Sequence, residues 1–214
     1  MKLVVVDYDS GNLRSVAKAL EFVGVQSVVT SDCAEIASAD AVVFPGVGSA
    51  PSAMAALNSR KLVQPLRDYV ASGRPFMGVC LGLQLLMDHT EEGDAQCLGI
   101  VPGHAKRLVT GLKVPHMGWN SVRFKQNHPI LRGIPQDSHF YFVHSYYAVP
   151  DDANGQAGVT NYGVDFCSVY ANGNLVATQF HPEKSGPVGL CIYKNFAAMA
   201  VQHAGAGQRL TAES

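Results

Sequence analysis

The first third of the chain alternates short apolar runs with longer amphipathic stretches. Runs rich in β-branched residues at 2–7, 25–30 and 41–44 predict buried strands. Between the first two, apolar residues recur at helical spacing from Leu13 to Val23, which predicts a helix ended by Gly24. The runs are apolar at successive positions, as is typical of parallel strands buried on both faces. The pattern therefore predicts an α/β fold, with a mostly parallel central sheet flanked by helices on both faces.

Further helices and a strand-to-helix junction complete this part of the chain. Asp9-Ser10-Gly11-Asn12 is a polar turn suited to capping the helix that begins at Leu13. Helices are also predicted at 50–57 and 62–71. The apolar run from Phe76 to Leu86 has the character of a buried strand that continues directly into a helix, and it is the centre of the predicted sheet.

After residue 97, glycine, proline and β-forming residues predominate. We expect shorter, partly antiparallel strands there, at residues 98–101, 105–109, 121–124, 139–147 and 166–170. Because no linker or repeat separates them from the first part, they predict a flanking sheet rather than a separate domain. One domain is therefore expected over residues 1–202, followed by a mobile tail rich in Gly and Ala over 203–214.

Composition and charge narrow the classes of function. A chain of 214 residues is long enough for one α/β domain without disulfide or metal staples. Its formal net charge of -1 offers no basic face for nucleic acid. Five cysteines without paired spacing indicate a reducing cytosol and no metal site. The apolar run at the N-terminus is too short for a membrane span. We expect a cytoplasmic protein that binds no membrane, metal or cofactor.

Cys80 is the candidate nucleophile. It stands at the predicted strand-to-helix corner between Gly78 and Gly82, two positions where a tight turn leaves little room for a side chain. Such an elbow exposes the corner side chain, and free N–H groups of the following helix favour the thiolate. A structural cysteine between packing glycines is the competing interpretation. A matching base elsewhere in the chain favours the catalytic one.

His181 and Glu183 supply that base and its orienting carboxylate. His181 ends a predicted strand that runs to Phe180, and Pro182 keeps its backbone extended. Side chains two residues apart in an extended chain point to the same side, so Glu183 can hold one imidazole nitrogen. A nucleophile, a base and an orienting group are thus present together, and we predict the catalytic triad Cys80, His181 and Glu183.

Other stretches add candidate residues. The loop Pro45-Gly46-Val47-Gly48 follows the third strand, at the edge of the sheet where active sites of parallel sheets lie. Backbone N–H groups around Val47 could hold an oxyanion beside the N–H of Leu81, although Gly-x-Gly alone is more often a simple turn. Residues 115–120 and 139–147 are dense in aromatic and hydrogen-bonding types, and each segment alone is more often structural.

These motifs resemble one known family. Gly-Val-Cys-Leu-Gly-Leu-Gln at 78–84 and Gln-Phe-His-Pro-Glu-Lys-Ser at 179–185 resemble the class I (triad) glutamine amidotransferases. Pro-Gly-Val-Gly, Pro-His-Met-Gly-Trp-Asn and Tyr-Phe-Val-His-Ser-Tyr are similar in particular to the glutaminase subunits of imidazole glycerol phosphate synthase, an enzyme of histidine biosynthesis. The resemblance covers the chain from Met1 to about Val201.

The resemblance implies hydrolysis of glutamine to glutamate and ammonia. It also implies a heterodimer with a (β/α)₈-barrel cyclase subunit, which uses the ammonia and whose ligand raises glutaminase turnover. For the amino-acid end of glutamine it implies Gly48, Gln84 and the strand His144-Ser145-Tyr146. Residues that it implies to lie near the interface with the cyclase are Asn12, Trp119, Tyr141 and Lys184.

Other functions stay open at this point. A free-standing cysteine hydrolase of γ-glutamyl or peptide bonds, a glutaminase subunit of another pathway and a catalytically silent binding module would share this fold. An intact triad disfavours the silent module. Because the chain shows neither a phosphate-cradling loop nor a second domain for an ammonia acceptor, we favour the subunit that feeds a separate synthase.

Overall fold

The computed structural model describes the backbone of residues 1–212 and the side chains of residues 1–205. Its centre is an eight-stranded sheet. In spatial order the strands are β2 (Ser27–Thr30), β1 (Leu3–Val6), β3 (Ala41–Gly46), β4 (Phe76–Cys80), β14 (Leu175–Thr178), β13 (Asp165–Asn172), β12 (Gln156–Asn161) and β9 (Arg123–Phe124). The strand that carries the predicted nucleophile, β4, is inside this sheet, as the sequence indicated.

The sheet changes from parallel to antiparallel along its width. Pairs β1–β2, β1–β3, β3–β4 and β4–β14 are parallel, whereas β13 pairs with β14 and β12 in antiparallel fashion. The predicted α/β fold with a mostly parallel sheet is thus confirmed. The antiparallel strands β12 and β13, however, extend the central sheet itself instead of belonging only to a flanking one.

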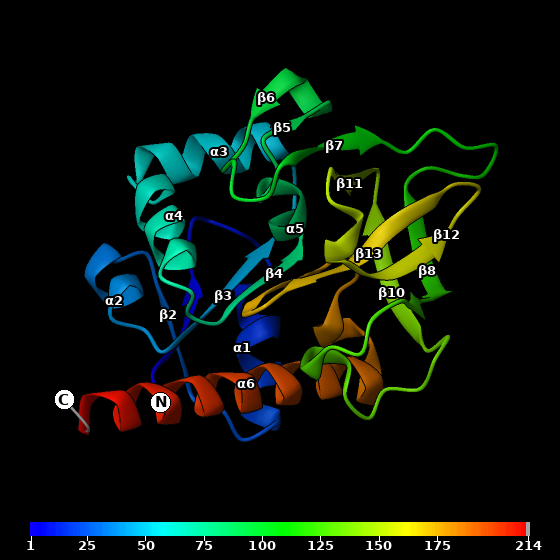
Figure 1. Cartoon of the computed structure of the whole chain (residues 1–214). Coiled ribbons are helices and arrows are strands. Elements are labelled where there is room, and N and C mark those ends of the chain that lie inside the picture. The colour runs from blue at the N-terminus through cyan, green and yellow to red at the C-terminus, as the bar shows by residue number, and fades with distance from the viewer. Residues whose placement is uncertain (213–214) are drawn as a thin grey trace.

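Helices cover both faces of the sheet (Figure 1). On one face α1 (Leu13–Phe22) and α6 (Gly186–Ala212) share a hydrophobic core with one set of strand residues, including Val5 and Val43. On the other face α2 (Cys33–Ala37), α3 (Ala50–Ser59) and α4 (Val63–Ala71) pack with the alternate set, including Val4 and Phe44. Successive strand residues therefore enter two different cores, which explains why these strands are apolar throughout.

Two smaller sheets flank the last strands of the central one. One pairs β8 (His116–Ser121) with β10 (His139–His144), and the other orders β11 (Tyr146–Pro150), β7 (Gly103–Arg107), β5 (His89–Thr90) and β6 (Ala95–Gln96). The expected single strand at 139–147 is in fact two strands, because the chain leaves one sheet for the other at Ser145. The break puts Ser145 between two sheets and beside the site described below.

The expected strand at 98–101 does not form. Backbone N–H groups of Leu98, Ile100 and Val101 donate instead to the carbonyl groups of Leu85 and Leu86. These carbonyls stand at the end of α5 (Leu81–Leu85), where no further helical turn satisfies them. The segment therefore closes the elbow helix and leaves no groups for a sheet partner.

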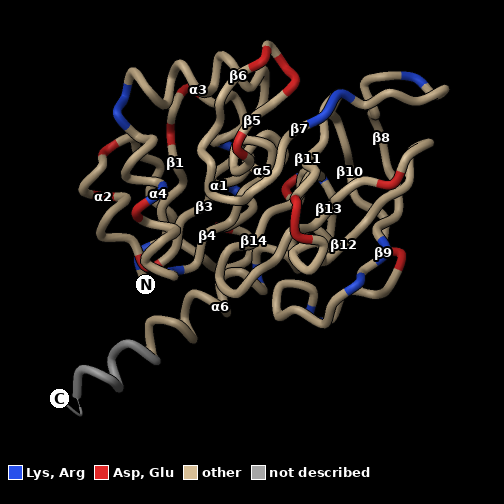
Figure 2. Tube along the Cα trace, turned by 45° about the horizontal axis from the view of Figure 1, so that its top comes forward, with Lys and Arg blue, Asp and Glu red and all other residues tan. Residues whose placement is uncertain are grey.

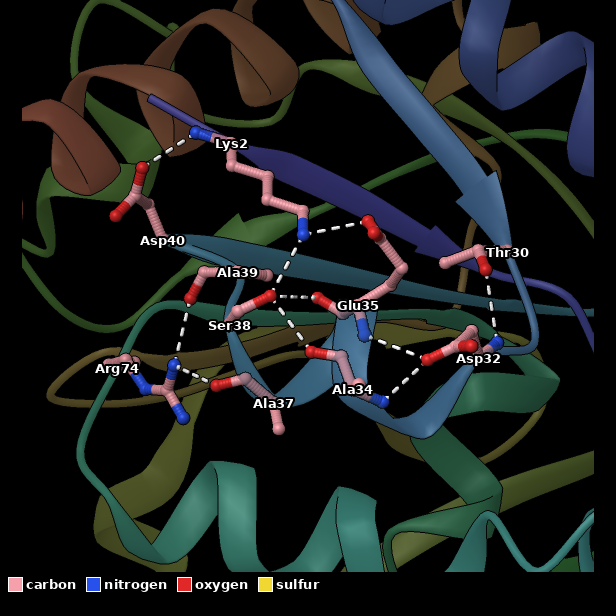
Figure 3. A network of polar contacts seen from close by, with 10 residues as sticks. All are labelled: Lys2, Thr30, Asp32, Ala34, Glu35, Ala37, Ser38, Ala39, Asp40 and Arg74. Atoms are coloured by element: carbon pink, nitrogen blue, oxygen red, sulfur yellow. Dashed lines mark hydrogen bonds and ion pairs between the residues drawn. The ribbon is translucent and has the colours of Figure 1, made fainter.

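A polar network fixes α2 beside β1 and β2 (Figure 3). The Asp32 carboxylate caps α2, and the Lys2 ammonium pairs with Glu35 at 2.7 Å. Arg74 donates to the carbonyl of Ala37, at the end of α2, at 2.7 Å and to that of Ala39 at 2.9 Å. Lys2 precedes β1 and Arg74 precedes β4, so these contacts tie the N-terminal ends of the strands together and leave the carboxyl ends free for a site.

Helix α6 continues through Ala212, without a change of secondary structure at residue 203. The mobility expected of residues 203–214 stays a prediction, and residues 213–214 lie outside the described part. Among the described residues, no helix is both long enough and apolar enough to cross a membrane. Lys and Arg are interspersed with Asp and Glu over the molecule (Figure 2).

Candidate active site

The backbone at Cys80 forms a strained corner. Cys80 has φ 54° and ψ -107°, in a region that residues other than glycine rarely adopt, and α5 begins at the next residue. A Cβ on Gly82 would overlap the carbonyl oxygen of Phe44, and one on Gly78 would lie 3.1 Å from the Cβ of Ala177. Glycine at both positions therefore lets the elbow pack against β3 and β14, as the sequence pattern indicated.

His181 reaches the same site from the end of β14. Its backbone is extended, with φ -98° and ψ 99°, and the chain then turns into the short 3₁₀ helix η4 (Pro182–Lys184). The turn brings the Glu183 carboxylate to 2.7 Å from His181 Nδ1. The predicted contact is thus present, although a 3₁₀ turn rather than continued extended chain produces it.

The electrostatics of His181 suit proton transfer. Burial lowers the pKa of His181, but the opposing effects of neighbouring Cys80 and Glu183 are together larger. The net result is a pKa raised to about 10. The ring therefore carries a proton whenever a thiolate stands beside it at neutral pH. Within the described part of the chain, Nε2 of His181 has no hydrogen-bond partner, so this nitrogen is left for proton exchange.

Glu183 is held by two further side chains that sequence reasoning did not assign to it. Asn12 Nδ2 donates to one carboxylate oxygen, and the Tyr193 hydroxyl donates to the other at 3.2 Å. Burial raises the pKa of Glu183, but the hydrogen bonds from His181 and Asn12 outweigh that effect and lower it. Glu183 is therefore a carboxylate with a fixed orientation.

The Asn12 side chain does not cap α1 as expected. Asn12 occupies the N-cap position of α1, but its side chain makes no capping hydrogen bond because the amide is turned toward Glu183. The side chain is also buried, with only 6% exposed. Asn12 therefore supports Glu183, and its expected place near the partner interface stays a prediction.

A cavity of about 300 Å³ opens over Cys80. Cys80 and His181, the two predicted catalytic residues that would act on substrate, line it. The residues expected at the oxyanion and at the amino-acid end of glutamine line it too: Val47, Leu81, Gly48, Gln84, His144, Ser145 and Tyr146. Four segments separated widely in the sequence thus converge on one cavity. The volume is enough for a small molecule of amino-acid size.

Three cavity residues were given no role from the sequence, namely Glu92, Pro115 and Val143. Pro115 and Val143 lie in the segments 115–120 and 139–147 that were singled out, whereas Glu92 lies outside them. Glu92 carries the carboxylate of the cavity lining, and its Oε2 accepts the N–H of Ala50 at 2.7 Å. That contact holds it at the start of α3. The acidic turn Glu91-Glu92-Gly93-Asp94 was the available signal, but nothing local relates this turn to Cys80.

Three of the four residues expected at the partner interface lie together. Trp119 and Tyr141 face each other across the β8–β10 pair with ring centroids 6.1 Å apart. Lys184 Nζ lies 6.0 Å from the centre of the Tyr141 ring. Trp119 is 57% exposed, which is unusual for so large an apolar side chain. We call Trp119, Tyr141 and Lys184 the aromatic patch.

Chemically, the site combines a nucleophilic sulfur, a protonated imidazole and a cavity suited to an amino acid. Among the described residues, no group of three or more His, Cys, Asp or Glu could hold a metal ion. The family model for class-I glutamine amidotransferases matches residues 4–199. The fold agrees with that match. The chain belongs to the class-I glutamine amidotransferase family.

Curated relatives narrow the position within the family. The chain is 49% identical over 200 residues to imidazole glycerol phosphate synthase subunit HisH of Dehalococcoides mccartyi strain CBDB1, covering 93% of this chain and 98% of that one. It is 48% identical to the subunit of the same name from Moorella thermoacetica, covering 95% and 97%. At this identity and coverage, the chain is more specifically similar to these subunits within the family.

Solved structures confirm the fold. A putative GMP synthase subunit from Thermoplasma acidophilum superposes with a TM-score of 0.75 at 18% identity, covering 97% of this chain and 98% of that one. The glutaminase domain of Trypanosoma brucei CTPS with bound acivicin gives 0.69 at 17% identity, covering 94% of each. At such low identity these structures establish the fold alone.

Proposed function

We propose that this chain hydrolyses glutamine to glutamate and ammonia with Cys80, His181 and Glu183, and passes the ammonia to a partner cyclase that makes imidazole glycerol phosphate in histidine biosynthesis. The observation that carries the proposal is the convergence of a strained Cys80 and a Glu183-bound His181 on one amino-acid-sized cavity. High identity to subunits of imidazole glycerol phosphate synthase supports the pathway.

The chemistry follows from these groups. The Cys80 thiolate attacks the side-chain amide carbon of glutamine, and backbone N–H groups of Leu81 and the Val47 loop hold the tetrahedral oxyanion. His181 gives its proton to the departing nitrogen, the C–N bond breaks, and a thioester remains. His181 then takes a proton from water, which attacks the thioester. The C–S bond breaks, glutamate leaves, and the thiolate is restored.

Recognition of glutamine needs groups for its charged end. We assign the α-ammonium group to the Glu92 carboxylate, since that carboxylate lines the cavity and is already oriented by Ala50. Gln84 and the segment His144-Ser145-Tyr146, with Gly48 opposite, are assigned to the rest of the amino-acid end. A neutral side-chain amide is left to face Cys80.

A cyclase partner gives the ammonia a use. Ammonia released into neutral water is protonated and loses its nucleophilicity, so the product must pass directly to an acceptor site. We assign the aromatic patch of Trp119, Tyr141 and Lys184 to the interface with a (β/α)₈-barrel cyclase in a heterodimer. Partner and acceptor are proposed to shift the Val47 loop toward its oxyanion-binding arrangement.

Substitution of the nucleophile tests the proposal. Cys80→Ala removes one small buried side chain, so it should abolish glutaminase activity in the complex with the cyclase while the thermal unfolding midpoint stays near that of the wild type. A glutamine-like electrophile should label Cys80 and spare the other four cysteines. Glutamate release by Cys80→Ala near the wild-type rate would contradict the assignment.

The partner requirement has its own test. The isolated chain should be nearly idle, and the cyclase together with its ribonucleotide ligand should raise glutamine turnover. If the isolated chain hydrolyses glutamine as fast as the complex does, a free-standing cysteine hydrolase becomes the better description.

A further inference from the structure

The Gln179 side chain contacts the sulfur of Cys80 but has no role in the proposed reaction. Its side chain is completely buried just beyond the end of β14. Its Nε2 lies 3.7 Å from Cys80 Sγ, and its Oε1 accepts a hydrogen bond from Gln84 Nε2 at 3.2 Å. Building on the proposed role of Cys80, we propose that Gln179 is a positioning residue that donates a hydrogen bond to this sulfur and stabilises it as thiolate.

The orientation of the Gln179 amide follows from neighbours that can act in one direction only. A backbone carbonyl only accepts, so the Gln84 atom that lies 2.8 Å from the Tyr146 oxygen must be its NH₂ group. The second N–H of that group points at Gln179. Gln179 must therefore present its oxygen to Gln84, which leaves its own NH₂ group toward Cys80.

Two buried histidines hold the same carbonyl from the other side. His144 Nδ1 lies 2.9 Å from the Tyr146 oxygen and must carry a hydrogen. Burial lowers the pKa of His144 to about 3 and that of His116 to about 4, so both rings are neutral at pH 7. His144 Nε2 is then an acceptor for His116 Nδ1 at 2.9 Å, and Asn120 donates to His116 Nε2 at 3.3 Å.

The donors of the histidine branch point toward the Tyr146 carbonyl. On the other side, Gln84 donates both to that carbonyl and to Gln179, which in turn donates to Cys80. The neutral rings fix the strand that carries Tyr146, and the Tyr146 carbonyl in turn fixes Gln84. A rotated Gln179 amide would place its NH₂ group against the NH₂ group of Gln84, which would leave a buried donor facing a donor. The arrangement therefore favours one orientation of Gln179 without using any charged group.

Two hydrogen-bond partners of the Cys80 sulfur favour opposite protonation states. The Val143 carbonyl, 3.8 Å away, can only accept an S–H, which favours the thiol. Gln179 Nε2 can only donate, which favours the thiolate. Gln179 is absent from the cavity lining, so its contribution falls on the reactivity of sulfur and not on the affinity for glutamine.

Alkylation of Cys80 by iodoacetamide across a pH range, followed by peptide mapping, tests this in the full chain. Gln179→Glu keeps the size and the acceptor for Gln84 but replaces the donor by an oxygen. Gln179→Met keeps the approximate shape and has neither group. A matched control is Gln26→Glu, an exposed position away from the cavity. Turnover of glutamine is measured in parallel in the complex with the cyclase.

The pH midpoint of Cys80 alkylation should rise by about one to two pH units in Gln179→Met, as expected for loss of a hydrogen bond to a charged group. It should rise further in Gln179→Glu, whose carboxylate repels the thiolate. kcat should fall about tenfold or more in both, with KM little changed, and Gln26→Glu should match the wild type. Circular dichroism and cooperative unfolding establish which variants are folded.

Wild-type midpoints in the folded variants would overturn the proposal. So would a shift in Gln179→Glu without one in Gln179→Met, because charge alone would then explain it. Alkylation does not depend on glutamine turnover. If Cys80→Ala still hydrolyses glutamine, the proposed function fails, whereas the alkylation result still decides the role of Gln179.

Discussion

At the scale of single residues, the triad divides into groups with unequal tasks. In the proposed mechanism His181 moves the proton and Glu183 keeps the ring in place. The Glu183 carboxylate is itself held by Asn12 and Tyr193. A group that orients another can be replaced in part by a neutral hydrogen-bonding side chain. A group that carries the proton cannot.

Kinetics of two variants should separate these tasks. His181→Ala should reduce kcat nearly as far as Cys80→Ala does, whereas Glu183→Gln should retain measurable glutaminase activity, because an amide oxygen can still accept from Nδ1. Steady-state rates of the complex, with saturating acceptor, give the comparison. Equal losses in both variants would show that Glu183 does more than orient the imidazole.

Glu92 gives a second prediction at this scale. Glu92→Gln keeps the acceptor for the Ala50 N–H and removes the charge, so KM for glutamine should rise about tenfold to hundredfold with a smaller change in kcat. Glu91→Gln is the matched control, since Glu91 is exposed, outside the cavity lining, and binds the Arg107 N–H instead. An unchanged KM in Glu92→Gln would remove Glu92 from the substrate site.

At the scale of elements, the elbow depends on the close approach of β3 and α5. The approach is backbone to backbone, because a Cβ on Gly46 would lie 2.9 Å from the Gly82 nitrogen and one on Gly82 would overlap the Phe44 carbonyl. Neither contact can be relieved by turning a flexible side chain. The position of Cys80 therefore depends on two segments with no side chain at their contact.

Gly82→Ala should consequently lower the free energy of unfolding by about 1–3 kcal/mol and reduce glutaminase activity strongly, since either the elbow or β3 must move. Urea unfolding and steady-state assays measure the two effects. Gly111→Ala is the control, because a Cβ there meets nothing within 4 Å. Equal stability and activity of the two variants would mean that the elbow is less tightly packed than the distances indicate.

At the scale of the whole molecule, buried histidines link stability to pH. His116 and His144 have pKa values lowered by burial to about 4 and about 3, below the ordinary value near 6.5. At pH values between the lowered pKa values and 6.5, these two histidines bind protons in the unfolded chain but not in the folded one. The free energy of unfolding should therefore fall as pH falls below 6.5. The pKa of His128 shifts in the same direction. The raised pKa of His181 opposes the slope only near pH 6.5, because at lower pH His181 is protonated in both states.

The expected slope is up to about 1.4 kcal/mol per pH unit for each of the two buried histidines between pH 6.5 and 5. Urea unfolding at several pH values in this window measures it. The double variant His116→Gln/His144→Gln should be less stable at pH 7 but should lose most of the slope. Parallel pH profiles for the variant and the wild type would refute the assignment.

Sequence alone determined the features that depend on neighbours in the chain. Three features are local constraints on backbone and side-chain direction, and each could be recognised in the sequence. They are the apolar runs of β1, β3 and β4, the glycines around Cys80, and the His-Pro-Glu segment. The triad could be predicted because its proposed base and orienting group are only two residues apart. Even the cavity residues came largely from motifs.

Only the tertiary structure decided what depends on groups distant in the chain. It placed β12 and β13 on the central sheet and turned Asn12 to Glu183. It also brought the Glu92 carboxylate to the cavity and fixed the Gln179 amide through Gln84 and Tyr146. Buried polar groups choose partners by direction and distance after the chain has packed. No local pattern records that choice, which is why these residues could not be assigned from sequence.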